Sequence, residues 1–473
     1  MNLQDVKTIY LMGVSGIAMG TLASMLKEMD YHVVGSDQDL YPPMSTHLEA
    51  LGIPVCRGYS SENLTRHSPD VVIVGNVIRR ENPEAQAILH NGVPYLSMPQ
   101  AIARFFLSRH DSVVVAGTHG KSTTSSLLAW MLTHAGMDPS AFIGAFVKNW
   151  DASYRLGTGR HMIIEGDEYD TAFFDKGPKF LHYRPYLGII TSIEFDHADI
   201  FPDFESVRKA FEGFVRLIPP TGYLVVNADD RECIALSRQC RGRVFTYGAS
   251  DQADWRLLEA DYPAGTVRFK IRNPLTGCIE SIFSYLPGRH NLANTVAAFA
   301  AASILGLSTN QIQKALPAFQ GVKRRQDIVG ESKGILIIDD FAHHPTAVRE
   351  TLQALRLFYP GRRLIAAFEP RTNSSRRAVF QHAYATVFDE ADCIGIKQPS
   401  GMQGIPEPER LNAMQLVQDL GKCQKDAHLF ERTEDLVGFL VSYCASGDLV
   451  VCMSNGSFDG LPQKLLAAFE SQL

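Results

Sequence analysis

The sequence predicts an α/β protein with parallel sheets. Three times along the chain an apolar strand leads into a turn that contains Gly or Asp, and a helical pattern follows the turn. Strands that alternate with helices of about 10 to 15 residues favour parallel sheets with right-handed crossovers. The chain has 473 residues, which is about three domains at a usual length of roughly 150 residues each. We therefore expect three domains, at 1–108, 109–320 and 321–473.

The three segments follow one another in the order strand, turn and helix. The first comprises the strand Thr8–Met12, the turn 13–16 and a helix that ends near Asp30, before the strand His32–Gly35. The second comprises the strand Ser112–Ala116, the turn 117–122 and the helix Thr123–His134. The third comprises the strand Ile335–Asp340, the turn 343–345 and the helix Thr346–Phe358. Between the second and third, Trp255–Tyr285 combines strand formers with Asn-Pro and Thr-Gly turn signals, which predicts a small antiparallel insertion.

The composition is that of a folded enzyme. Hydrophobic residues make up 45% of the chain and charged residues 20%, and 45 Lys+Arg stand against 51 Asp+Glu, so that no basic excess favours a nucleic-acid partner. The sequence shows neither a signal peptide nor an apolar run long enough to span a bilayer. Its eight Cys contain no CxxC pair. They indicate reduced thiols of a cytoplasmic protein, with neither a disulfide framework nor a zinc site.

The strongest motif is VVVAGTHGKSTT, at the second turn. Gly117 and Gly120 allow a tight loop whose N–H groups can surround phosphate oxygens at a helix N-terminus. Lys121 would reach the β- and γ-phosphates, and Ser122 would offer its hydroxyl to Mg²⁺. Because Val115 stands where the general pattern has its first glycine, the match is to a shorter loop variant, and an ordinary strand-to-helix turn stays open as the alternative.

Two acidic segments follow predicted strands. The segment IIEGDEYD places four carboxylates after the strand Met162–Ile164, and crowded carboxylates repel unless a cation neutralises them. One of them beside a nucleotide suits Mg²⁺; a solvated acidic turn is the alternative. The segment GIITSIEFDHADIF predicts a strand that ends in Glu194, Asp196, His197 and Asp199, at the edge where open α/β sheets bind ligands. A histidine that only caps or packs is the alternative there.

Two further segments suggest nucleotide binding. GVSGIAMG has Ser15 and Ala18 where a dinucleotide fingerprint has glycines, but Ser36 and Asp37 close the next strand where such folds hold ribose hydroxyls; a tight turn with a helix-capping Asp is the alternative. LPGRHNLANTVAA places the amides of Asn291 and Asn294 at helical spacing, where they suit a purine edge. A helix N-cap explains Asn291 equally well.

In this order, the segments GTHGKSTT, EGDEYD, EFDH, GRHNLANTVAA, GVKRRQD and DDFAHHPT resemble the Mur ligase family over essentially the whole chain. The resemblance implies an ATP-dependent amide ligase of peptidoglycan synthesis and recycling. It also implies a Rossmann-like UDP-binding domain, a central P-loop ATPase domain with a parallel and a small antiparallel sheet, and a Rossmann-like C-terminal domain.

Other segments distinguish branches of the family. YPPMS, NPE, EYDTAFFDKGPKFLHYRP, FEPRTNS and MSNGSFDGL are most similar to the branch that joins UDP-N-acetylmuramate to the recycled murein tripeptide L-alanyl-γ-D-glutamyl-meso-diaminopimelate. The nearest alternative is the branch that adds a single L-alanine to the same nucleotide sugar. An NAD-dependent oxidoreductase would leave Lys121 and the acidic cluster without a task, and a nucleotide-binding regulator would not need three domains.

The resemblance assigns residue roles position by position. ATP would be bound by Gly117, Thr118, His119, Gly120, Lys121, Ser122, Thr123, His290, Asn291, Asn294, Arg325 and Asp340, with Asp340 on the ribose. The UDP portion would be bound by Gly13, Ser15, Gly16, Ser36 and Asp37, and Mg²⁺ by Ser122, Glu165 and His197. The catalytic groups would be Lys121, His197, Arg325 and His344. Where several relatives have a carbamylated lysine near the second metal, this chain aligns Arg208, with Lys209 adjacent. Arginine cannot be carbamylated in that way, so a second metal site stays open but no lysine is assigned to it.

A peptide-binding residue follows from the position of FEPRTNS. This loop begins after the predicted strand Arg363–Ala367 and contains Arg371. A tripeptide that ends in diaminopimelate carries several carboxylates, and Arg can hold one in a planar two-point contact that Lys cannot reproduce. We therefore expect Arg371 to bind the incoming peptide; a surface arginine that contributes little is the alternative.

Overall fold

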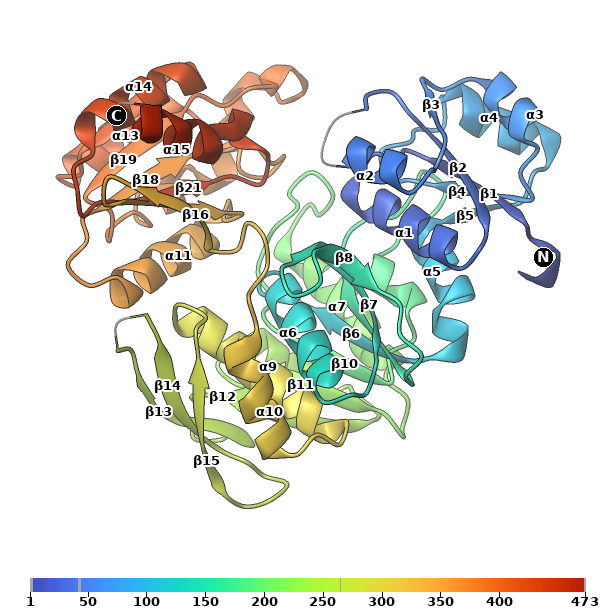
Figure 1. Ribbon diagram of the computed structural model, residues 1–473, viewed down its shortest axis with the longest axis horizontal. Coiled ribbons are helices and arrows are strands. Elements are labelled where there is room, and N and C mark those ends of the chain that lie inside the picture. The colour runs from blue at the N-terminus through green and yellow to red at the C-terminus, as the bar shows by residue number, and fades with distance from the viewer. Residues whose placement is uncertain (1–2, 41–43, 264, 472–473) are drawn as a thin grey trace. The chain divides into compact units, whose positions relative to one another are not determined.

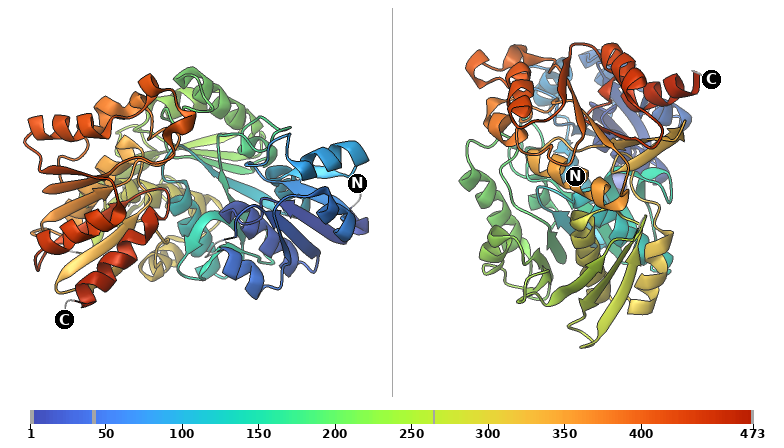
Figure 2. Two further views of the ribbon diagram at one scale, coloured as in Figure 1. Left: turned by 90° about the horizontal axis from the view of Figure 1, so that it is seen from above. Right: turned by 90° about the vertical axis from the view of Figure 1, so that its left-hand side faces the viewer.

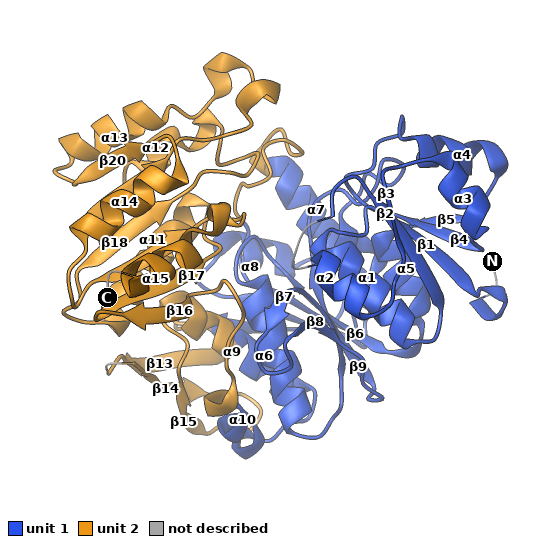
Figure 3. Ribbon diagram, turned by 45° about the horizontal axis from the view of Figure 1, so that its top comes forward, with its two compact units in different colours: residues 1–193, 205–247, 297–315 blue, residues 194–204, 248–296, 316–473 orange. Residues whose placement is uncertain are grey.

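The computed structural model describes residues 3–40, 44–263 and 265–471, which fall into two compact units (Figure 3). One unit comprises Met1–Ile193, Glu205–Tyr247 and Ala297–Ala315, and the other comprises Glu194–Phe204, Gly248–Val296 and Leu316–Leu473. The three-domain boundaries stay a prediction beside this division. Tyr41, Pro42 and Pro43 of the YPPMS segment lie outside the described residues. No helix in the described part of the chain is long and apolar enough to cross a membrane.

The N-terminal part of the chain forms a parallel sheet with strand order β3-β2-β1-β4-β5 (Figure 1). Its strands are β1 Thr8–Met12, β2 His32–Asp37, β3 Val55–Arg57, β4 Val71–Val74 and β5 Tyr95–Ser97, and its helices are α1 Ile17–Glu28, α2 Met44–Ala50, α3 Ser61–His67, α4 Pro83–Asn91 and α5 Met98–Phe105. The central strands β1 and β4 are almost wholly buried, as apolar parallel strands covered by helices are. The first predicted strand, turn and helix are confirmed.

The sheet of the central region has the order β12-β11-β10-β6-β9-β7-β8 and is parallel except for the edge strand β8. Its strands are β6 Asp111–Ala116, β7 Ser140–Val147, β8 Ala152–Arg155, β9 His161–Gly166, β10 Leu187–Ile190, β11 Tyr223–Asn227 and β12 Arg243–Gly248. The accompanying helices are α6 Lys121–His134, α7 Phe204–Leu217, α8 Arg231–Ser237, α9 Arg289–Ile304 and α10 Thr309–Ala315. The second predicted segment is confirmed, with α6 beginning two residues earlier than expected.

The strand predicted to end in Glu194, Asp196, His197 and Asp199 is shorter than expected. Strand β10 ends at Ile190, and the next residues hydrogen-bond to the phosphate loop: the Thr118 N–H donates to the Ser192 carbonyl at 2.9 Å, and the Thr191 hydroxyl donates to the His119 carbonyl at 2.5 Å. The Ile193 N–H donates to Asp230 at 2.9 Å. Because the Ser192 carbonyl and the Ile193 N–H are used in these bonds, they do not extend the ladder of the sheet.

The predicted antiparallel insertion is confirmed. It consists of β13 Trp255–Asp261, β14 Val267–Arg272 and β15 Ile279–Ser284, which pair in sequence order. Strand β14 alternates between buried and exposed residues, as expected for a sheet with one face toward solvent.

The C-terminal sheet has the order β16-β17-β21-β18-β19-β20, in which only β16 pairs antiparallel. The strands are β16 Asp327–Ser332, β17 Ile335–Asp340, β18 Leu364–Phe368, β19 Cys393–Lys397, β20 Ala427–Phe430 and β21 Leu449–Met453, and the helices are α11 Pro345–Phe358, α12 Gln381–Tyr384, α13 Ala413–Lys422, α14 Thr433–Tyr443 and α15 Leu461–Ser471. The third predicted segment, β17 to α11, is confirmed.

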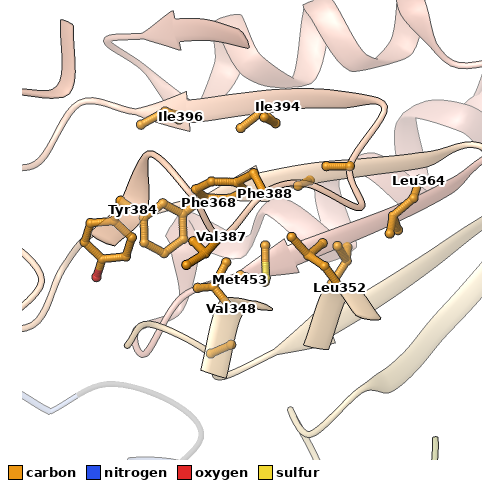
Figure 4. Packing of buried hydrophobic residues seen from close by; sticks show 14 of the residues in the cluster. Val348, Leu352, Leu364, Phe368, Tyr384, Val387, Phe388, Ile394, Ile396 and Met453 are labelled. Atoms are coloured by element: carbon orange, nitrogen blue, oxygen red, sulfur yellow. The ribbon is translucent and has the colours of Figure 1, made fainter. Parts of the chain in front are cut away.

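Helices cover both faces of the C-terminal sheet. On one face, side chains of α11, α12 and α13 pack against alternate strand residues, and Figure 4 shows Val348 and Leu352 of α11 in this core with Phe368 and Ile394. The other strand residues form a second core with α14 and α15, which lie side by side in Figures 1 and 2. This three-layer arrangement leaves the loops at the carboxyl ends of the strands free to carry function.

Candidate active site

The phosphate loop has a backbone that only glycine adopts without strain. Gly117 has φ +136°, and a Cβ atom there would lie 2.0 Å from the Thr191 hydroxyl oxygen. Gly120, the N-cap of α6, has φ +82°. The loop therefore brings the chain directly onto the N-terminus of α6, where N–H groups and the helix dipole favour a phosphate.

Lys121 is held at the start of α6 by two oxygen acceptors. Its Nζ donates to the Gly117 carbonyl at 2.6 Å and to Glu168 Oε2 at 3.1 Å. Burial alone would lower the pKa of Lys121, but the carboxylates of Glu168 and Asp167 raise it above its usual value. The lysine is therefore a firmly protonated cation beside the phosphate loop.

The acidic segment after β9 is not a solvated turn. Glu168 is only 2% exposed and pairs with Lys121, Asp167 pairs with Lys179 at 2.8 Å, and Asp170 pairs with Lys176 at 3.0 Å. Burial would raise the pKa of Asp167, but Lys179 and Lys121 lower it to about 2. The chain thus neutralises these three carboxylates with its own lysines.

The fourth carboxylate of the segment, Glu165, is positioned differently. The Ser122 hydroxyl donates to Glu165 Oε2 at 3.0 Å, and the Gly144 N–H donates to Oε1 at 2.7 Å. Two neighbouring ligands of an octahedral Mg²⁺ lie about 2.9 Å apart, since each is about 2.0–2.1 Å from the ion. The spacing of the Ser122 and Glu165 oxygens, and their being hard oxygen donors, therefore fit a magnesium ion.

A cavity of about 380 Å³ lies at the first turn of the N-terminal sheet. Gly13, Ser15, Gly16 and Asp37 line it, as the sequence analysis expects of a UDP site. The Asp37 carboxylate accepts a hydrogen bond from the Ser15 N–H at 2.8 Å, which orders the turn before α1. Ser36 does not line the cavity: it is fully buried and donates to Glu84 at 2.6 Å, because the side chains of successive strand residues point to opposite faces.

The same cavity contains residues that the sequence analysis missed. Thr171 and Lys179 line it, although they follow Ser15 by more than 150 positions. The hydroxyl oxygens of Ser15 and Thr171 are buried, and within the described ranges neither has a hydrogen-bond partner. Since buried polar groups are normally paired, the two orphaned hydroxyls in one cavity indicate a polar ligand.

The amides predicted to face the adenine come together at the start of α9. Asn294 Nδ2 donates to Asn291 Oδ1 at 3.3 Å, and Asn291 Nδ2 donates to the Pro287 carbonyl and to Gln326 Oε1. Asn291 is not an N-cap, because α9 already begins at Arg289. Gln326, a neighbour that the sequence analysis did not single out, also lies 3.5 Å from His290 through its amide nitrogen. Only its place beside Arg325 in GVKRRQD signalled it.

Asp340 and Arg325 are neighbours at the end of β17. The Asp340 carboxylate accepts hydrogen bonds from the N–H groups of Gln326 and Ala342, both at 2.7 Å. Burial raises the pKa of Asp340, and the Arg325 guanidinium opposes that rise. Asp340 thus orders the loop that carries Arg325, while its binding of a ribose stays a prediction.

His197 and His344 surround a buried acid. Burial would raise the pKa of Asp196, but His197, His343 and His344 lower it well below its usual range. His344 is the N-cap of α11, where its Nδ1 accepts from the Thr346 N–H at 3.3 Å. The catalytic roles of His197 and His344 stay predictions beside this structural role.

Arg371 lies in the loop after β18, at the carboxyl end of the strand. It is exposed and makes no hydrogen bond or ion pair with another described residue. Its side chain passes over Gly456: a Cβ atom on that glycine would lie 2.0 Å from Arg371 Nη1. The guanidinium is therefore available to a ligand.

Comparison with known proteins identifies the family. Three domain models match in chain order: "Mur ligase family, catalytic domain" at 8–110, "Mur ligase middle domain" at 115–302 and "Mur ligase, glutamate ligase domain" at 324–456. The Escherichia coli (strain K12) UDP-N-acetylmuramate--L-alanyl-gamma-D-glutamyl-meso-2,6-diaminoheptandioate ligase is 35% identical over 97% of both chains. The chain belongs to the Mur ligase family. It is therefore an ATP-dependent ligase that forms an amide bond.

The chain is also similar to Mur ligases that are named for L-alanine and to two solved structures. A Bradyrhizobium sp. (strain BTAi1) UDP-N-acetylmuramate--L-alanine ligase is 33% identical over 98% of this chain and 99% of its own length. The crystal structure of a murein peptide ligase from Psychrobacter arcticus 273-4 matches with a TM-score of 0.75 and 31% identity over 98% of both chains. The UDP-N-acetylmuramate-alanine ligase of Thermotoga maritima matches with a TM-score of 0.82 at 22% identity, covering 99% of this chain and 100% of its own, and supports the fold alone.

Proposed function

We propose that this Mur ligase joins UDP-N-acetylmuramate to the tripeptide L-alanyl-γ-D-glutamyl-meso-diaminopimelate. The observation that carries the choice is the 35% identity to two relatives named for this tripeptide, against 31–33% for relatives named for L-alanine. The guanidinium of Arg371, which makes no ion pair in the described part of the chain, supports it, since the tripeptide carries more carboxylates than L-alanine. The addition of L-alanine is the second candidate.

The chemistry has to activate a carboxylate, which is a poor electrophile. The lactyl carboxylate of the muramic acid attacks the γ-phosphate of ATP, and the acylphosphate that forms is attacked by the amino group of the peptide. An amide, ADP and phosphate result. Lys121, protonated at the start of α6, stabilises the charge on the transferring phosphoryl group. Arg325, His197 and His344 are assigned to the same reaction by the family resemblance, and these roles stay predictions.

Mg²⁺ is supported by the pair of Ser122 and Glu165. When bound by their oxygens, the ion would supply positive charge beside the phosphates. The Gly144 N–H, which donates to the second oxygen of Glu165, would orient the carboxylate.

The cavity at the first turn supports binding of the UDP portion. The orphaned hydroxyls of Ser15 and Thr171 can donate to diphosphate oxygens. Asp37 orders the turn that presents Ser15. The sugar nucleotide would thus supply acceptors for two hydroxyls that have no partner within the described ranges.

The test is phosphate release from ATP by the purified protein, followed by mass analysis of the product. UDP-N-acetylmuramate is supplied with the tripeptide or with L-alanine, and each is omitted in turn. We expect release that requires both the sugar nucleotide and the tripeptide, with a product that contains both. Release that L-alanine supports better would favour the second candidate, and no release with either amine would contradict both.

A further inference from the structure

Three side chains of types that can bind a metal lie together at the amino ends of strands β19 and β20 of the C-terminal sheet. Cys393, Asp426 and His428 place a thiol sulfur, a carboxylate oxygen and an imidazole nitrogen within 4.8 Å of one another. Cys393 is the first residue of β19, and Asp426 immediately precedes β20. Arg371 follows the carboxyl end of β18, which is parallel to β19. The cluster and the predicted peptide-binding loop therefore lie at opposite ends of the parallel strands.

The register of the two strands explains how the cluster forms. Ile394 pairs with Ala427 in a parallel ladder, which places Cys393 beside Asp426. Asp426 and His428 are two positions apart along the chain, and residues with this spacing in a strand point to the same face. Their ligand atoms are adjacent: His428 Nε2 lies 2.8 Å from Asp426 Oδ1.

One of the three side chains is buried and the other two are partly exposed to solvent. Cys393 is fully buried in the core under α14, while the side chains of His428 and Asp426 are 40% and 46% exposed. An ion can therefore reach the exposed pair from solvent and meet the sulfur beneath it. Oxygen-rich sites suit Mg²⁺ and Ca²⁺, but a thiolate with an imidazole and one carboxylate suits Zn²⁺.

Supporting groups orient two of the three ligands. The Tyr443 hydroxyl donates to Asp426 Oδ2 at 2.9 Å, which leaves Oδ1 directed toward His428. The ring of Phe439 packs on the His428 ring with a centroid distance of 4.7 Å. Partners of this kind fix ligand orientation in zinc proteins.

We propose that Cys393, Asp426 and His428 bind a zinc ion, with water as the fourth ligand. Ligand atoms about 2.0 Å from a tetrahedral ion lie about 3.3 Å apart, so His428 and Asp426 need to separate by only about half an ångström. The thiol proton passes to solvent as the sulfur binds. The ion would tie the edge strand β20 to β19. The spacing of the ligands in sequence gives no zinc motif, because two strands and their pairing create the site.

The test is a titration of the full-length protein with Co²⁺, which gives an intense near-ultraviolet band only when a thiolate binds it, in excess Mg²⁺ to fill the proposed catalytic site. We expect one equivalent of Co²⁺ to produce the band and Zn²⁺ to displace it. The band should be lost in Cys393→Ser and in His428→Gln, which changes an exposed side chain and preserves folding. Tyr443→Phe should weaken Zn²⁺ binding about 10- to 100-fold. Cys423→Ser and His382→Gln, at exposed positions of the same region, are the matched controls and should keep the band.

Absence of the band in the folded wild type would overturn the proposal, as would an undiminished band in Cys393→Ser or His428→Gln. Loss of the band in a control variant would place the ion elsewhere and would also overturn it. A Zn²⁺-dependent rise in melting temperature that is present in wild type and absent in His428→Gln is a second expected result, because an ion that binds only the folded state stabilises it. An equal rise in both proteins would contradict the site.

Discussion

Replacement of Arg371 by Lys tests both the peptide site and the choice of substrate. Arg371 is exposed and makes no ion pair with another residue in the described ranges, so the change should leave the fold intact. An Arg can donate two parallel N–H···O bonds to one carboxylate, and a Lys in the same place retains a single point contact. The perturbation therefore removes one charge-assisted hydrogen bond to the peptide and keeps the positive charge.

The size of the effect follows from the energy of that bond. A hydrogen bond to a charged group contributes about 1.5–3 kcal/mol, and about 1.4 kcal/mol corresponds to a tenfold change in an equilibrium constant. The expected rise in KM for the tripeptide is about 10-fold, at the lower end of the resulting range, since exposure to solvent weakens such contacts. Because the lost contact is made equally in the ground state and the transition state, kcat should change little.

The assay is steady-state kinetics of phosphate release with the tripeptide, ATP and UDP-N-acetylmuramate varied in turn. The matched control is Arg432→Lys, at a side chain that is 68% exposed in the same sheet region and pairs only loosely with Glu434 at 3.7 Å. KM for ATP should stay the same in both variants. An unchanged KM for the tripeptide in Arg371→Lys, or an equal rise for L-alanine, would refute the reasoning.

Three other substitutions probe the rest of the site. Gly456→Ala should displace the Arg371 side chain, and so raise KM for the tripeptide like Arg371→Lys while the free energy of unfolding changes by less than about 1 kcal/mol; a large loss of stability in urea unfolding would contradict this. Lys121→Ala should lower both ATP affinity and kcat in ligation assays, because its cation contacts charge present throughout the reaction; near-normal rates would move the ATP site elsewhere. Glu165→Gln should raise the Mg²⁺ concentration needed for half-maximal activity, since it removes the charge but keeps the shape; an unchanged Mg²⁺ dependence would assign the ion to another residue.

The parts of the fold that the sequence predicted are those set by local pattern. Gly117 and Gly120 occupy positions with positive φ, so their identity alone indicates a tight turn before α6. The apolar runs of β1, β6 and β17 are bounded by turn residues and were located to within one residue. The end of β10 was placed too late, because Ser192 binds the phosphate loop and Ile193 binds Asp230, which are long-range contacts that no local pattern reveals.

The site residues also differ in whether local sequence or long-range packing determines their place. The family resemblance assigned both Asp37 and Ser15 to the UDP site, and the structure joins them by a hydrogen bond because β1 and β2 pair in parallel. Ser36 was assigned to the same site, but the fold gives it to Glu84, a buried carboxylate that also accepts from Tyr10 and Asn63. That network assembles groups from four separate elements. A residue next to a predicted ligand-binding residue can thus belong to the buried hydrogen-bond network instead of the binding site. The sequence alone does not distinguish these two roles.

Charge balance around the phosphate loop links the fold to the chemistry. In the structure the Lys121 ammonium is neutralised by Glu168, and the neighbouring Asp167 is neutralised by Lys179. If Lys121 turns toward the phosphates of ATP, Glu168 loses its buried partner, and a buried carboxylate without one is costly. A divalent cation that binds at Ser122 and Glu165 brings positive charge into this region together with the nucleotide. Lysines pair with Glu168, Asp167 and Asp170, whereas Glu165 accepts from the Ser122 hydroxyl, so we expect a cation at Glu165 to bind together with ATP.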